Sequence, residues 1–189
     1  DHAPWPYGGG FVSNCRMLPA QLEGYVFTVR ALAQRYAGQL RILCGLEAEY
    51  IPAHMDWLRE QIACYSLDYV ILGNHFDRSE VTGLYFGACT KPEDLEAYAD
   101  TAIEAMSTGI YCCLAHPDLC FSRYPQFDAA AEKSMRRVCA AAARLNIPLE
   151  YNLLGETRRL TEDHSQDLGY TTPQFWRIAA EYPVRAIIG

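Results

Sequence analysis

The sequence predicts an α/β fold in which parallel strands alternate with helices. Apolar runs alternate with segments of helical periodicity along the whole chain. The runs are nearly continuous, which is typical of strands covered on both faces. No linker, repeat or low-complexity segment interrupts the 189 residues, so we expect residues 1–189 to form a single domain. At this level, a barrel and a doubly wound open sheet both fit.

Five segments space their apolar residues by three and four, which is typical of helices with one buried face. Gly38 ends the first of them, Asp128 can cap the fourth, and Pro173 begins the fifth. We interpret residues 156–170 as a polar loop. The predicted helices are 22–36, 55–65, 92–106, 128–145 and 173–182.

Four apolar runs lie between these helices and a fifth follows the last helix, and all five are predicted to be strands. The sequence contains neither GxGxxG nor GxxxxGK[ST], which weakens any reading as a nucleotide-binding fold. The predicted strands are residues 40–50, 68–75, 110–116, 147–154 and 184–189.

Composition narrows the possible partners. The formal net charge of −7 disfavours binding to nucleic acid by bulk attraction. No apolar run approaches the roughly 18 residues of a membrane span, and we identify no signal peptide. The eight cysteines lack CxxC spacing and fit free thiols in a reducing compartment. We expect a cytoplasmic protein without nucleic-acid or membrane partners; the oligomeric state is not indicated.

Polar residues stand where several predicted strands end. "LRILCGLEAEYI" carries Glu47, "DYVILGNHFD" carries His75, "IYCCLAHPD" carries His116, and the chain opens with His2. The carboxyl ends of parallel strands carry the chemistry of α/β folds. Imidazole and carboxylate ligands suit Zn, Mn or Fe, and a carboxylate can bridge two ions. The pattern indicates a metal site, although each histidine alone also fits a structural role in a barrel enzyme of other chemistry.

The motifs "DHAP", "GLEAEY", "DYVILGNHF", "LAHPDL" and "LEYN", in this order, resemble the PHP (polymerase and histidinol phosphatase) family, and within it the monofunctional histidinol-phosphatase branch. The similarity spans essentially the whole chain. It implies a distorted (β/α)₇ TIM-like barrel with up to three divalent ions at its carboxyl rim. It makes His2, Glu47, His75 and His116 metal ligands, with Glu47 as the bridge, and makes Glu47, His75 and His116 catalytic.

The resemblance also implies an HxH pair before the "DH" element and an Asp-x-His element after the last strand. Neither is present between Asp1 and Gly189. We therefore expect the chain to be a fragment, with an incomplete barrel and an incomplete trinuclear site.

The activity that the resemblance implies is hydrolysis of L-histidinol phosphate to L-histidinol and phosphate. Arg16, Arg158 and Arg159 are candidate phosphate anchors, because a guanidinium binds two phosphate oxygens at once; each also fits a solvated surface cation. Trp5, Tyr7 and Phe11 could contact the imidazole of the substrate or pack in the core. The alternatives are a PHP phosphoesterase acting on another small molecule or a nucleotide, and a metal-poor, inactive fragment.

Overall fold

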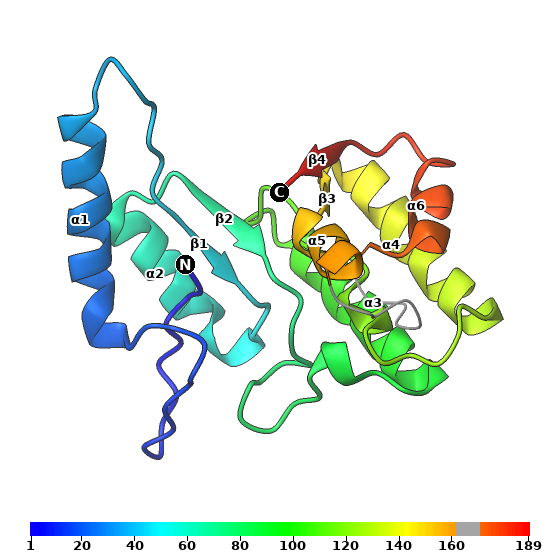
Figure 1. Ribbon diagram of the computed structural model, residues 1–189. Helices are drawn as coiled ribbons and strands as arrows, with labels where there is room; N and C mark the ends of the chain where they lie inside the picture. Colours follow the sequence, from blue (N-terminus) through cyan, green and yellow to red (C-terminus); the bar gives the residue numbers. More distant parts are fainter. Residues whose placement is uncertain (162–170) are drawn as a thin grey trace.

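The computed structural model describes residues 1–161 and 171–189, without the side chains of 158–161. Short strands are interspersed with helices along the chain (Figure 1). The elements are α1 (Leu22–Arg35), β1 (Gly45–Ala48), α2 (Met55–Tyr65), β2 (Tyr69–Leu72), α3 (Pro92–Ser107), α4 (Ala129–Leu145), β3 (Leu149–Tyr151), α5 (Leu153–Thr161), α6 (Pro173–Ala179) and β4 (Ala186–Ile188). Among the described residues, α3 and α4, as well as α5 and α6, follow each other without a named strand between them.

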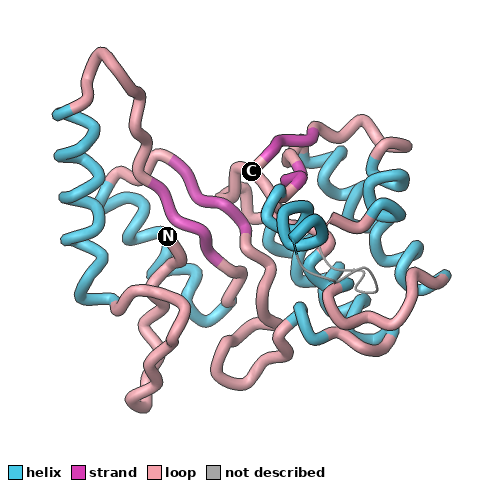
Figure 2. The backbone as a smooth tube through the Cα atoms, in the orientation of Figure 1, coloured by secondary structure: helices cyan, strands magenta, loops and turns pink. Residues whose placement is uncertain are grey.

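The strands are parallel and follow one another in sequence order. β1 pairs with β2, so that Glu47 lies opposite Ile71, and β3 pairs with β4. Between these two pairs lies the segment 112–115, whose Leu114 bridges to Leu72 on one side and to Leu149 on the other. Figure 2 shows the two strand pairs joined through this region. Sequence order with parallel pairing brings all the carboxyl ends to one edge.

The predicted α/β class is confirmed, whereas a closed barrel is not found. Within residues 1–161 and 171–189, no backbone pairing joins β4 to β1 or to the segment at His2. The sheet of the described residues is therefore open.

The predicted strand at 110–116 is wrong in extent, as is the predicted start of the first strand at residue 40. Residues 112–115 do bond to β2, through Cys112 N to Val70 O at 2.8 Å and Ala115 N to Leu72 O at 2.9 Å, but form only isolated bridges. An apolar run reports burial rather than the length of the hydrogen-bonded ladder. The runs therefore located the strands and overestimated their length.

The loop predicted at 156–170 and the strand end predicted at 153–154 are also wrong, because α5 occupies 153–161. The Asn152 side chain accepts a hydrogen bond from the backbone N–H of Leu154 at 3.0 Å. This contact caps the amino end of the helix and stops the strand. The rest of the predicted loop, 162–170 with His164, lies outside the described residues.

One leucine from each of β1, β2, the segment 112–115 and β3 is buried in a common core. Leu46, Leu72, Leu114 and Leu149 are at most 1% exposed. Helices α3 and α4 pack against each other beside this core and contribute buried residues, among them Leu95, Tyr98, Met106, Met135 and Val138. Burial of these leucines fixes the strand positions and therefore where their polar ends lie.

The cysteines are free thiols, five of them buried. Among the helices of the described residues, none combines the length and the apolar character needed to cross a membrane.

The cap predicted at Asp128 is confirmed and gives a test of α4. Its side chain accepts from Ala131 N at 2.9 Å and also from the Tyr124 hydroxyl at 3.1 Å. We expect Asp128→Ala to lower the free energy of unfolding by ~1 kcal/mol, because a helix N–H loses its partner. Denaturant unfolding measures the change. Asp128→Asn, which keeps an accepting oxygen, should retain most of the stability, and equal losses in both variants would contradict the capping role.

Candidate metal centre

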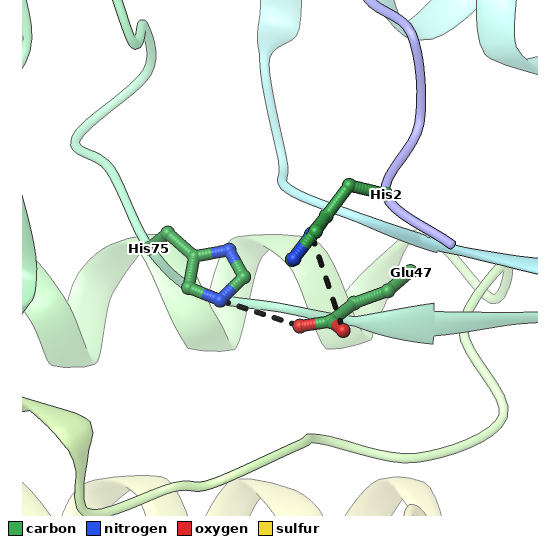
Figure 3. Close-up of side chains that lie close together, drawn as sticks. All are labelled: His2, Glu47 and His75. Atoms are coloured by element: carbon green, nitrogen blue, oxygen red, sulfur yellow. Dashed lines mark ion pairs between the residues drawn. The ribbon is translucent and has the colours of Figure 1, made fainter. Parts of the chain in front are cut away.

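Four predicted ligands from distant parts of the sequence meet at one edge of the sheet. Glu47 lies in β1, His75 follows β2, and His116 follows the segment 112–115. His2 forms a parallel bridge with Glu47 from the other side of β1. Figure 3 shows the rings of His2 and His75 next to the Glu47 carboxylate, each joined to one of its oxygens by a dashed line. Parallel strands in sequence order bring these residues together.

The two oxygens of Glu47 face different imidazoles. Oε1 lies 3.3 Å from Nε2 of His75 and 3.1 Å from Nε2 of His116, and these two nitrogens are 3.3 Å apart. Oε2 lies 4.0 Å from Nδ1 of His2. Glu47 therefore lies at the centre of the cluster.

The residues of this cluster fit a divalent cation. Nδ1 of His2 is buried and has no hydrogen-bond partner among the described residues. The ligand atoms of His2, Glu47 and His75 all lie within 4.8 Å of one another. A buried imidazole nitrogen without a hydrogen bond is costly unless something else occupies it. Imidazole nitrogens with a carboxylate form the donor set that Zn, Mn and Fe prefer.

Burial and nearby charges shift the pKa values of two residues of the cluster, Glu47 and His2. Burial raises the pKa of Glu47, but the hydrogen bond from His116 and the charges of His75 and His116 outweigh it and lower the pKa to about 2. Burial lowers the pKa of His2 from its ordinary value, against the opposing effect of Glu47. Glu47 is therefore ionised at neutral pH, and His2 favours the neutral form that binds cations.

Glu49 lies directly behind the cluster and is completely buried. It accepts hydrogen bonds from Nδ1 of His75 at 2.9 Å and from Nε1 of Trp5 at 2.6 Å. Burial raises the pKa of this carboxyl, but the hydrogen bonds from His75 and Arg16 hold the pKa well below its usual range. Through its contact with the His75 ring, Glu49 supports a residue of the cluster.

Arg16 contacts carboxylates rather than solvent. Its guanidinium binds both oxygens of Glu49, at 3.0 and 2.9 Å, and its Nε donates to Glu80 at 2.8 Å. The side chain is only 2% exposed. Its predicted role as a phosphate anchor therefore competes with these ion pairs.

Arg158 and Arg159 belong to α5, which directly follows β3. Their side chains lie outside the described residues, so their role as phosphate anchors stays a prediction.

Two supporting residues were not predicted. Glu150 in β3 accepts from the backbone N–H of His116 at 2.9 Å, and His116 has a positive φ of 30°. Such a conformation is costly for a non-glycine residue and persists where its surroundings impose it. A Cβ at Gly73 would clash with the Glu47 carboxylate and the His75 ring. The "LEYN" motif contains Glu150, which was the available signal for that residue.

A pocket of about 280 Å³ opens beside the cluster. Of the aromatic residues proposed for the substrate, Trp5 is buried in the core at 2% exposure, whereas Tyr7 and Phe11 do not line the pocket. The aromatic residues that line the pocket are instead Phe76 and Tyr85. The lining residues are His2, Cys15, Arg16, Glu49, His75, Phe76 and Tyr85.

Comparison with known proteins agrees with the motifs. No family model matches the sequence. A curated Deinococcus radiodurans protein named "Probable histidinol-phosphatase" is 26% identical over 199 residues, covering 100% of this chain and 71% of that protein.

Two solved structures share the fold at 18% identity. One is a Listeria monocytogenes protein provisionally named histidinol phosphatase, with a TM-score of 0.69 over 100% of this chain and 80% of that one. The other is the histidinol phosphate phosphatase of Lactococcus lactis in complex with zinc, L-histidinol and phosphate. Its TM-score is 0.56, over 88% of this chain and 76% of that one. The resemblance predicted from the motifs is confirmed: the chain is similar to a probable histidinol-phosphatase in sequence and shares its fold with two solved structures of that name.

Proposed function

We propose that this protein is a metal-dependent phosphomonoesterase that hydrolyses L-histidinol phosphate to L-histidinol and phosphate. The observation that carries the proposal is the convergence of His2, Glu47, His75 and His116 on one edge of the sheet. The Deinococcus relative and the ligands of the Lactococcus structure support the same substrate. We further propose an incomplete (β/α)₇ barrel formed by residues 1–189 as one domain, working in the cytoplasm.

The charges of the site explain why cations are needed. Among the described side chains of the site, Glu49 and Glu80 pair with the guanidinium of Arg16, and Glu47 adds a third carboxylate beside the histidines. With neutral histidines this environment is negative and repels a phosphate dianion. Divalent cations, when bound, offset the charge on the phosphoryl oxygens and lower the pKa of water to about 7.

The chain contributes ligands, orientation and a binding surface. His2, Glu47, His75 and His116 would hold the cations, and Glu47 can serve two of them because both oxygens face imidazoles. The pocket beside them would receive the ester, with Phe76 and Tyr85, whose rings lie 5.4 Å apart, against its organic part. Arg158 and Arg159 remain the proposed phosphate anchors, because α5 follows a strand that ends at the same edge.

Another phosphate ester, including a nucleotide, is the alternative substrate, and a metal-poor inactive chain is the alternative state. An assay of phosphate release distinguishes these possibilities. Its substrates are L-histidinol phosphate, nucleoside monophosphates and sugar phosphates, each with added Zn²⁺ or Mn²⁺. We expect the highest kcat/KM for L-histidinol phosphate and complete loss after chelation, restored by metal. Faster cleavage of nucleotides would overturn the substrate, and less than about one metal per chain at saturation would overturn the metal site.

Removal of a ligand should abolish activity without unfolding the protein. We expect His116→Ala and Glu47→Gln each to lower kcat/KM at least ~100-fold and to reduce bound Zn²⁺, because each removes a donor from the cluster. His54→Gln is the matched control, since the His54 ring packs on Trp5 at a centroid distance of 6.1 Å and lies outside the cluster. Full activity of His116→Ala would mean that the histidines meet by coincidence.

If Arg158 and Arg159 bind the phosphate, their replacement should change KM and not the metal content. We expect Arg158→Met and Arg159→Met to raise KM for L-histidinol phosphate by about 10-fold where a charged hydrogen bond to phosphate is lost. Bound Zn²⁺ should not change. Arg137→Met, which removes a surface arginine paired with Asp100, is the control. An unchanged KM in both variants would exclude the two residues as anchors.

A further inference from the structure

The carboxylate of Glu49 accepts hydrogen bonds from three side chains. One of them, the guanidinium of Arg16, donates to both carboxylate oxygens. The donors are Nε1 of Trp5, the two terminal nitrogens of Arg16, and Nδ1 of His75. Glu49 itself is completely buried, and the Arg16 side chain is 2% exposed. A carboxylate bound to a guanidinium in this way acts only as an acceptor.

This environment determines which nitrogen of His75 carries the proton. Because Glu49 can only accept, the hydrogen between it and Nδ1 of His75 must belong to the imidazole. In the neutral ring Nε2 is then the unprotonated nitrogen. That atom lies 3.3 Å from both Glu47 Oε1 and His116 Nε2, so its lone pair points into the cluster.

Arg16 is committed to the same arrangement. Its Nε donates to Glu80, one terminal nitrogen donates to Glu49 and to the carbonyl of Ala3 at 3.0 Å, and the other donates to Glu49. Four of its five N–H groups therefore bind protein atoms. A two-pronged grip on phosphate would require Arg16 to release Glu49 and leave a buried carboxylate without its counter-charge.

We propose that Glu49, held in place by Arg16 and Trp5, is a positioning residue that fixes His75 in the Nδ1–H tautomer and directs Nε2 toward the cation site. Arg16 thus acts through Glu49 and not on the substrate. The inference rests on the proposed function for its effect on catalysis, although its effect on His75 can be measured without any substrate.

Histidine tautomers are read directly by ¹⁵N NMR of the imidazole nitrogens in the metal-free protein, with His75 assigned by comparison with His75→Gln. Zinc affinity is measured separately by calorimetric titration. For the wild type we expect the Nδ1–H tautomer of His75. For Glu49→Gln we expect a mixture of tautomers and zinc affinity lower by ~10- to 100-fold, as is typical when the partner of a ligating histidine is altered.

A second variant guards against misfolding of Glu49→Gln. Arg16→Lys keeps the positive charge and loses the two-pronged contact. We expect it to fold, to weaken zinc binding several-fold and to leave KM for L-histidinol phosphate at saturating zinc within about 2-fold of wild type, with the loss in kcat. A large rise in KM with unchanged zinc affinity would instead assign Arg16 to the phosphate and overturn the proposal.

Glu80→Gln is the matched control, because Glu80 contacts Arg16 but is not hydrogen-bonded to His75. It should leave the tautomer unchanged and zinc affinity within about 2-fold. A His75 tautomer and a zinc affinity unaffected by Glu49→Gln would overturn the inference. If the tautomer and affinity respond as expected while the wild type fails to hydrolyse L-histidinol phosphate, the proposed function fails and the positioning role stands.

Discussion

The site depends on one carboxylate shared among imidazoles from separate strands. Glu47 can face His75 and His116 with one oxygen and His2 with the other only if the neighbouring segments keep their parallel register. A slip of one residue would turn Glu47 to the opposite face of β1. The buried leucines resist such a slip, since Leu46 and Leu72 would have to leave the core. The packing of the core therefore also fixes the geometry of the site.

Two further carboxylates contact different parts of the histidines of the cluster. Glu150 bonds the backbone N–H of His116, which has an unfavourable φ, whereas Glu49 bonds the ring of His75. Gly73 leaves the room that Glu47 and His75 need to approach each other. Fixing rings and backbone in advance reduces the entropy lost when a ligand binds.

The parts of the fold that follow from periodicity could be predicted, and the parts that follow from single side-chain contacts could not. The first four helices were located to within a residue or two, because their apolar spacing is regular. Helix α5 was missed because one side-chain hydrogen bond from Leu154 N to Asn152 ends the strand and begins the helix. The proximity of His2, Glu47, His75 and His116 could be predicted because parallel strands bring their carboxyl ends together. Glu49 stands two residues from Glu47 and faces the same side, yet only the three-dimensional contacts distinguish ligand from support.

Three-dimensional contacts also determine whether an arginine near the site has donors left to bind phosphate. The sequence places Arg16 in the loop after "DHAP" and Arg158 and Arg159 directly after a predicted strand, and each is a candidate phosphate anchor. The number of donors that remain available separates them, because a guanidinium already bound to two carboxylates has little left for a third anion. Glu49 and Glu80 occupy Arg16 in this way. On the proposed function, a phosphate dianion beside these carboxylates would need positive charge from elsewhere, and this is the role proposed for bound cations and for the arginines of α5.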